Sequence, residues 1–138
     1  MIFLTDENIS PYAARMLGSF DRKNDIKAHE DCFEKGKPDI EWILDVANWE
    51  PKPIIVCGDG RILRKPSEQT ALRNACLMFV YLASGWTNLS WEDFAWKIVK
   101  AWPAIVQNVK KTRKPSVFEV SVKSGKVDLI RLISSLGR

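Results

Sequence analysis

Histidine and cysteine are scarce in this sequence, which limits the kinds of metal site and catalytic site that it can form. His29 is the only histidine among 138 residues, which excludes zinc centres built from several histidines. It is also the one base available to a Ser-His-Asp or Cys-His arrangement, and we interpret it as an ordinary residue at a strand end. The three cysteines are an odd number. Cys57 and Cys76 stand in apolar segments, where a thiol behaves as a small hydrophobic group, so we expect a reducing, cytoplasmic environment.

Long apolar runs are missing as well. No stretch of about 18 apolar residues occurs, and the first residues do not form a charged leader followed by an apolar run. The longest apolar stretch, residues 76–83 (CLMFVYLA), has the length of a buried strand. We therefore expect neither secretion nor a membrane-spanning segment. A chain of 138 residues is long enough for one domain with its own hydrophobic core.

Charge is moderate overall but unevenly distributed along the chain. The formal net charge is +4 and the pI is about 9.0. Residues 1–60 carry twelve acidic and seven basic side chains, whereas residues 97–138 carry two and ten. A basic segment of this kind is typical of a protein that binds a polyanion or an acidic partner, and equally of an ordinary solvated surface.

Apolar patterning predicts strands that alternate with helices. Four runs rich in strand-forming residues are expected to be strands: residues 2–4, 25–29, 53–57 and 77–82. Helices are expected to follow the first three strands, each beginning at a residue able to cap a helix: Ser10, Asp39 and Ser67. This alternation predicts an α/β fold with a mostly parallel central sheet.

The last third of the chain predicts one long helix and a hairpin. Ser90 and Asp93 have the spacing of a capping box ahead of an apolar stripe, and Pro103 either kinks this helix or starts a new one. Residues 116–130 alternate in polarity around Ser124 and Gly125, which predicts an edge hairpin.

Tryptophan is the most frequent aromatic residue together with phenylalanine, at six copies each. Four of the tryptophans fall on expected helices, where we interpret them as buried in the core or against a partner rather than stacked on bases: Trp42, Trp91, Trp96 and Trp102. The first expected helix is predicted to turn Tyr12, Ala13, Met16 and Leu17 inward and to end near Gly18.

Acidic residues occupy positions at which a parallel sheet would gather them. Asp6 follows the first expected strand and Asp59 the third, and the carboxyl ends of parallel strands form the binding edge of such a sheet. Asp39 reaches that edge only if residues 31–38 fold toward it. Clustered carboxylates repel one another unless a cation compensates, and Mg²⁺ or Mn²⁺ is the ion that oxygen ligands favour.

The same acids also fit purely structural roles. Asp39 could cap its helix, which is worth about 1 kcal/mol, and Glu41 could be an exposed charge in its first turn. Asp59 between two glycines could be a turn residue. The spacing alone leaves the structural role and the metal site open.

Three segments resemble the PIN-like nucleases, especially the VapC-type toxins of toxin-antitoxin systems. They are FLTDENIS (residues 3–10), KPDIEWILDVANW (37–49) and IIVCGDGRILRKPSEQTALRNA (54–75). The resemblance implies a single PIN-like domain over residues 1–138, a three-layer sandwich in which helices flank a mostly parallel sheet. A C-terminal hairpin extension is expected within residues 115–133.

The resemblance also implies an activity, a cofactor and partners. Active members of this family cut RNA with clustered acids and Mg²⁺ or Mn²⁺, so a metal-dependent endoribonuclease is expected, with Asp6, Asp39 and Asp59 as catalytic residues and metal ligands. Glu41 is a further candidate ligand. The implied partners are an RNA substrate and a cognate antitoxin protein, with a homodimer as one allowed assembly and no membrane partner.

Two positions depart from the family pattern. Cys57 stands where many PIN domains have a hydroxyl residue two positions before the third acid, and a thiol hydrogen-bonds less well. A fourth acid has no clear counterpart, although Glu68 could reach the site. Basic residues near Asp59 are expected either to hold RNA phosphates or to be only the polar side of a loop and helix: Arg61, Arg64, Lys65 and Arg73.

Two other functions remain open from the sequence. One is a noncatalytic protein of the same fold that binds RNA or a protein. The other is phosphoryl transfer to Asp59, as in receiver-like α/β domains, although the segment after residues 76–83 lacks the strand-end lysine that such a site uses.

Overall fold

The computed structural model describes residues 1–58, 60, 70–71 and 74–130. The strands are β1 (Ile2–Thr5), β2 (Asp25–Ala28), β3 (Ile54–Cys57), β4 (Met78–Leu82), β5 (Val117–Val120) and β6 (Val127–Ile130). The helices are α1 (Pro11–Phe20), α2 (Asp39–Val46) and α4 (Trp91–Lys111), with short 3₁₀ helices η1 (His29–Asp31) and η3 (Trp86–Asn88).

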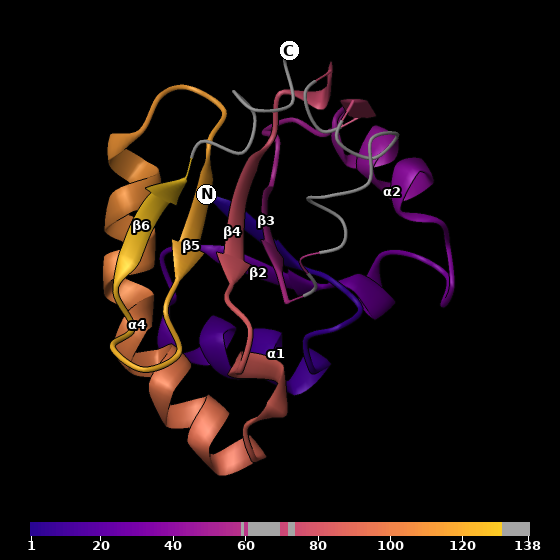
Figure 1. Ribbon diagram of the computed structural model, residues 1–138. Coiled ribbons are helices and arrows are strands. Elements are labelled where there is room, and N and C mark those ends of the chain that lie inside the picture. Colours follow the sequence, from indigo (N-terminus) through magenta and orange to yellow (C-terminus); the bar gives the residue numbers. More distant parts are fainter. Residues whose placement is uncertain (59, 61–69, 72–73, 131–138) are drawn as a thin grey trace.

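The strands form one six-stranded sheet in the order β2-β1-β3-β4-β5-β6 (Figure 1). All neighbouring pairs are parallel except β5 and β6, which are antiparallel. The predicted α/β fold with a mostly parallel sheet is therefore confirmed, and so is the terminal hairpin. Gly125 in its turn has a φ of +69°, a conformation that glycine adopts without strain.

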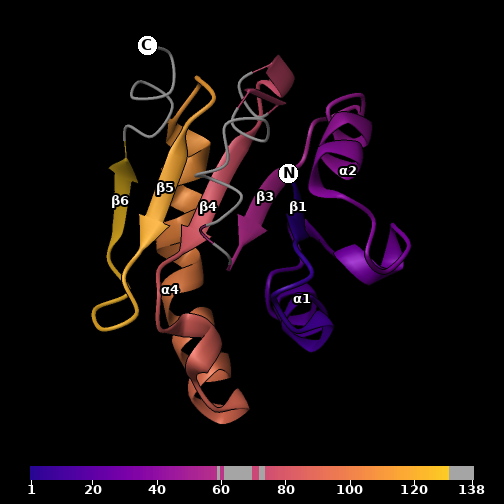
Figure 2. The same ribbon diagram turned by 45° about the vertical axis from the view of Figure 1, so that its right-hand side comes forward.

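Helices cover both faces of the sheet, as Figure 2 shows with α4 and α2 on opposite sides. Every residue of β3 is buried, because its alternating side chains enter two separate cores. Ile54 and Val56 pack in the core shared with α1 and α4. Ile55 and Cys57 pack with α2 and with residues 71 and 75. This double burial explains the unbroken apolar run of β3.

Helix α1 begins as predicted and buries most of the predicted face, because Ala13 and Leu17 are buried and Met16 packs against the core. The Oγ of Ser10 accepts a hydrogen bond from the backbone N of Tyr12 at 3.2 Å, and Pro11 occupies the first turn. Tyr12 is nevertheless 66% exposed, and its ring lies 6.4 Å from that of Trp91. The expectation that Tyr12 points into the core is wrong because, in the first turn of α1, it packs toward the start of α4. The helix also extends two residues past Gly18, to Phe20.

Helix α4 is one continuous helix of 21 residues with Pro103 inside it. Its apolar stripe faces the sheet, and Trp102 is buried with its ring 4.7 Å from that of Phe3. Trp91 and Trp96 are 44% and 54% exposed, so burial of these two in the core is wrong. In the part of the chain that the structure describes, no helix combines the length and the apolar character needed to cross a membrane.

Ser90 is the N-cap of α4, and its Oγ accepts a hydrogen bond from the backbone N of Asp93 at 3.2 Å. We expect Ser90→Ala to lower the free energy of unfolding by about 1 kcal/mol, because one N–H at the helix start then loses its partner. Urea denaturation measures this loss. Ser90→Thr keeps the hydroxyl and serves as the control, and equal stability of the Ala and Thr variants would contradict the capping role.

Cys76 differs from its expected placement. It stands in an apolar segment of the sequence, where a thiol was expected to behave as a small hydrophobic group, but it is exposed and has a φ of +54° in the turn before β4. The apolar stretch that contains it enters the core only from Leu77 onward, where burial begins. Cys57, by contrast, is fully buried in β3, which fits the behaviour of a small hydrophobic group.

Candidate active site

The strand order identifies where a ligand is expected to bind. From β1 the chain crosses to β2 on one side, and then returns past β1 to β3 on the other side. The crevice at the carboxyl ends of β1 and β3 is therefore the point where the order reverses, which is the usual ligand site of open α/β sheets. Asp6 directly follows β1, and its backbone N donates to the carbonyl oxygen of Val56 in β3 at 3.0 Å.

Asp6 is a buried acid. The residue is only 6% exposed. One oxygen of its carboxylate accepts a hydrogen bond from the backbone N of Asn8 at 3.0 Å. Burial raises the pKa of Asp6 to about 7, although hydrogen bonds from Asn8 and from the backbone of Gly58 oppose this shift. The negative charge of Asp39 raises this pKa further. Ionised Asp6 therefore lacks a sufficient counter-charge among the described residues.

Asp39 lies close enough to Asp6 for their charges to interact. The expected fold of residues 31–38 toward the sheet edge is visible in one contact, where the backbone N of Gly36 donates to Oε1 of Glu7 at 3.0 Å. The expectation that Asp39 caps α2 is wrong, because the N-cap is Pro38 and Asp39 is the first helical residue. Its Oδ1 accepts a hydrogen bond from Nε1 of the buried Trp42 at 2.9 Å.

Other predicted site residues are placed differently or are not described. Glu41 is exposed on the first turn of α2. Six of the predicted residues lie outside the described residues: Asp59, Arg61, Arg64, Lys65, Glu68 and Arg73. Within the described ranges, no group of three or more His, Cys, Asp and Glu side chains is arranged to hold a metal ion. Asp6 and Asp39 nevertheless offer the hard oxygen donors that Mg²⁺ and Mn²⁺ prefer.

His29 directly follows β2, as expected of a strand-end residue, but it is buried beside the acids. It is 2% exposed, and neither ring nitrogen has a hydrogen-bond partner within the described part of the protein. Its Nδ1 lies 3.5 Å from Oε1 of Glu7, and its ring packs edge-on against Trp42 at 5.4 Å. Burial lowers the pKa of His29, while Glu7 and Asp39 raise it. The burial of His29 beside Glu7 and Asp39 could not be predicted from the sequence, because a single histidine forms no motif.

A cavity of about 240 Å³ opens on the acid side of the crevice. Asp6, Glu7, His29 and Lys35 are among the residues that line it. Lys35 is exposed and could hold a phosphate beside the acids. Lys35 was not predicted from the sequence, because it stands in a loop of mixed charges without a distinctive pattern.

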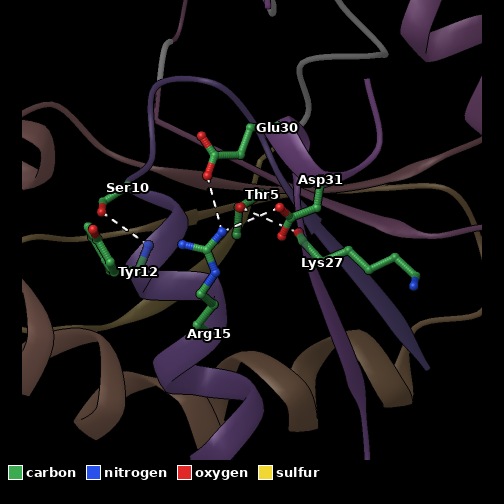
Figure 3. A network of polar contacts seen from close by, with 7 residues as sticks. All are labelled: Thr5, Ser10, Tyr12, Arg15, Lys27, Glu30 and Asp31. Carbon is green, nitrogen blue, oxygen red and sulfur yellow. Dashed lines mark hydrogen bonds and ion pairs between the residues drawn. The ribbon is translucent and has the colours of Figure 1, made fainter. Parts of the chain in front are cut away.

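Arg15 in α1 forms ion pairs with two acids of η1. Its guanidinium lies 3.1 Å from Oε1 of Glu30 and 3.3 Å from Oδ1 of Asp31. Figure 3 shows the guanidinium between these two carboxylates. Thr5, at the end of β1, donates from Oγ1 to the carbonyl oxygen of Lys27 in β2 at 3.4 Å. The ion pairs of Arg15 are half exposed and contribute little stability. Their effect is to tie α1 to η1 on either side of the crevice.

A second, larger cavity of about 690 Å³ lies on the other side of the β1–α1 loop. One wall comes from this loop and α1, and includes Asn8, Ile9 and Tyr12; the other comes from η3 and α4, and includes Thr87 and Trp91. Gly58 allows this packing, because a Cβ there would lie 2.8 Å from Cγ2 of Thr87. Ile9 also lines the acid-side cavity, so the two cavities share a wall.

Comparison with known proteins gives one match. No curated protein and no solved structure matches this chain. A family model described as PIN like domain matches residues 1–84, which include Asp6, Asp39 and the first four strands. PIN-like domains are generally nucleases, and they generally use divalent metals. Since the match covers more than half of the chain and agrees with its fold and its acidic crevice, the chain belongs to the PIN-like domain family.

Proposed function

We propose that this protein is an endoribonuclease that depends on Mg²⁺ or Mn²⁺. The observation that carries the proposal is the buried carboxyl of Asp6, whose pKa is raised to about 7 beside the charge of Asp39. The ionised form of such a buried acid is unfavourable, so Asp6 keeps its proton up to about pH 7 unless a cation binds there, and a nuclease centre needs that cation.

The residues of the proposed active site have three roles: some would bind the metal ion, one positions a metal ligand, and the basic ones would contact RNA phosphates. Asp6, Asp39 and Asp59 would hold the ion, with Glu41 as a further candidate. When bound, the ion supplies Lewis-acid stabilisation of the phosphodiester and lowers the pKa of a water molecule. Trp42 holds one carboxylate oxygen of Asp39 in place through its indole N–H. The basic side chains proposed to hold RNA phosphates are Lys35, Arg61, Arg64, Lys65 and Arg73.

The direct test is incubation of the purified protein with a varied pool of RNA. We expect cleavage when Mg²⁺ or Mn²⁺ is present, and we expect EDTA to stop it, because the acids alone cannot activate water at a phosphodiester. Gel electrophoresis of end-labelled RNA measures the products. Circular dichroism confirms the fold, and a folded protein that cuts nothing in either metal would overturn the proposal.

We further propose that the protein is the toxin of a toxin-antitoxin pair acting in the cytoplasm. Support comes from the family membership and from the resemblance of its three acidic segments to VapC-type toxins. Induced expression should arrest growth, and co-expression of a short protein encoded by the adjacent gene should relieve the arrest. Growth that continues while active nuclease accumulates would count against a toxin but not against a nuclease.

A noncatalytic RNA-binding or protein-binding role is the second candidate. It is favoured by the excess of basic side chains in residues 97–138, which carry ten basic and two acidic residues and so can hold a polyanion or an acidic partner without any chemistry. In that case the RNA affinity of the protein would be the same with EDTA as with Mg²⁺, and no product would form.

Trp42→Phe tests whether the indole N–H positions Asp39. We expect the Mn²⁺ concentration for half-maximal cleavage to rise about 10-fold, because groups that hydrogen-bond to metal ligands typically contribute this much to metal affinity. The measurement is initial cleavage rate against metal concentration.

Trp49→Phe is the matched control for Trp42→Phe, because the Trp49 ring stacks on Phe33 at 6.2 Å in the same aromatic cluster. Its metal dependence should match that of the wild type. An equal shift in both variants would indicate a general packing defect rather than a role for the indole N–H.

A further inference from the structure

Two aromatic rings are presented at the mouth of the 690 Å³ cavity, although both come from helices with buried apolar faces. Tyr12 in the first turn of α1 is 66% exposed, and Trp91 at the start of α4 is 44% exposed. Their centroids are 6.4 Å apart and their planes meet at 66°, so they form a corner. Exposed rings from segments 79 positions apart are brought together by the fold, which points to a ligand.

The rings are supported from behind, which keeps the corner rigid. Trp91 stacks on Phe94 with an interplanar angle of 16°, and Phe94 meets the buried Trp86 edge-on at 5.7 Å. Trp86 is itself fixed, because its Nε1 donates to the carbonyl oxygen of Val120 at 3.0 Å. The guanidinium of Arg15 lies 5.6 Å from the centroid of Tyr12. A flat ligand therefore meets surfaces that do not need to be ordered on binding.

The β1–α1 loop separates the cavity from Asp6, and one residue of that loop contacts both. Asn8 lines the cavity, and its backbone N donates to the carboxylate of Asp6 at 3.0 Å. Thr87 and Ser10 add hydroxyl groups to the walls. An apolar, aromatic cavity with a few polar groups is the usual form of a small-molecule site, for which volumes of about 300 to 1,000 Å³ are common.

We infer that this cavity binds one unpaired nucleobase of the RNA substrate, stacked in the corner of Tyr12 and Trp91, while the adjoining phosphate lies toward the cation that Asp6 and Asp39 would hold. This inference rests on the proposed nuclease function. A nucleobase fits because it is flat, stacks on aromatic faces and carries polar edges that amide and hydroxyl groups recognise. A base within a duplex is already stacked and cannot enter, so the substrate class is single-stranded RNA.

Binding of RNA without cleavage tests the subsite. The probe is a fluorescein-labelled eight-nucleotide RNA of mixed sequence in EDTA, and fluorescence anisotropy measures its dissociation constant. We expect Tyr12→Ala and Trp91→Ala each to weaken binding roughly 5- to 100-fold, because stacking on an aromatic side chain contributes about that factor per base. Trp91→Phe should restore most of the loss, and a blunt duplex of the same sequence should bind at least several-fold more weakly.

Trp96→Ala is the matched control. Trp96 is also an exposed tryptophan of α4, at 54%, but it lines a different cavity beside Lys97 and Lys100. Its RNA affinity should remain within about twofold of the wild type. Equal losses for Trp91→Ala and Trp96→Ala, or no loss for Trp91→Ala, would overturn the inference and leave a protein partner as the ligand of the corner.

An abasic series locates the base that occupies the corner. Eight RNAs, each lacking the base at one position, are measured against the wild type and Trp91→Ala. At one position, removal of the base should weaken RNA binding by the wild type. In Trp91→Ala the same removal should not weaken RNA binding further, because the stacking partner is already missing. Additive losses at every position would overturn the inference.

The two proposals fail separately. RNA cleavage that persists with unchanged affinity in Trp91→Ala rejects the base subsite but keeps the nuclease. Binding that requires both rings, with no cleavage in Mg²⁺ or Mn²⁺, keeps the subsite and rejects the nuclease.

Discussion

Asp6→Asn is expected to reduce RNA cleavage on the order of 1,000-fold while the protein stays folded. The substitution removes the charge that draws a divalent cation into the crevice, and a catalytic metal contributes several kcal/mol to the stabilisation of a transition state. The amide oxygen of Asn can still accept the hydrogen bond that Asp6 receives from the backbone N of Asn8. The loss should therefore come from chemistry rather than from collapse of the β1–α1 loop. Single-turnover cleavage at saturating Mn²⁺ measures it.

Asp45→Asn is the matched control for this loss. Asp45 is also an acid of the N-terminal half, but its side chain is 51% exposed and pairs with Lys37 at 2.7 Å on the outer surface of α2. Its cleavage rate should stay within about twofold of the wild type, as expected of an exposed ion pair. If Asp6→Asn keeps more than half of the wild-type rate, Asp6 is not a metal ligand and the nuclease proposal loses its main support.

Much of the fold follows from short-range patterns in the sequence. The run of β3 is apolar throughout because both of its faces are covered, and Ser90 marks the start of α4 through its hydroxyl. These signals depend only on neighbouring residues, so one sequence is sufficient to find them. The exposure of Tyr12 and Trp91 could not be found in this way, because it depends on how the starts of α1 and α4 meet on the same face of the sheet.

The candidate site was only partly predictable for the same reason. Asp6 was identified because the carboxyl end of β1 must lie at the binding edge of a parallel sheet. The place of Asp39 relative to Asp6 depends on the loop before α2, which no local pattern encodes, whereas its contact with Trp42 follows from their spacing of three residues on one helix. His29 and Lys35 enter the crevice through loop geometry alone, and both were missed as parts of the site.

Asp6→Asn is also expected to stabilise the metal-free protein at high pH. In the folded protein the pKa of Asp6 is about 7, against an ordinary value of 3.8 for an aspartate in water. Between these two pH values the unfolded chain releases the proton of Asp6 while the folded protein keeps it, so the wild-type stability falls as pH rises. Each pKa unit corresponds to about 1.4 kcal/mol, which gives a loss on the order of 4 kcal/mol by pH 8. Asn does not titrate, so the variant avoids this loss.

Urea denaturation in EDTA at pH 4 and pH 8 measures this difference. The difference in the free energy of unfolding between Asp6→Asn and the wild type should be greater at pH 8 than at pH 4, on the order of 4 kcal/mol. Asp21→Asn should show almost no such change between these two pH values, because the pKa of Asp21 is lowered and its titration falls below this range. Partial burial disfavours ionised Asp21, but hydrogen bonds from Asn24, Trp102 and Lys23 outweigh it and lower the pKa of Asp21. Its stabilising effect is therefore present above the ordinary aspartate pKa of 3.8 and is lost as pH falls through the folded value.

Divalent metal should reverse the effect of pH at Asp6. A cation bound to the ionised carboxylate stabilises only the folded protein, so at pH 8 Mn²⁺ should raise the melting temperature of the wild type and leave that of Asp6→Asn nearly unchanged. The contrary result is a stability difference between the wild type and Asp6→Asn that is the same at pH 4 and pH 8. It would mean that Asp6 ionises in the folded protein without a cost in stability. The crevice would then have no electrostatic demand for a metal ion, because it is the burial of an uncompensated carboxylate that creates this demand.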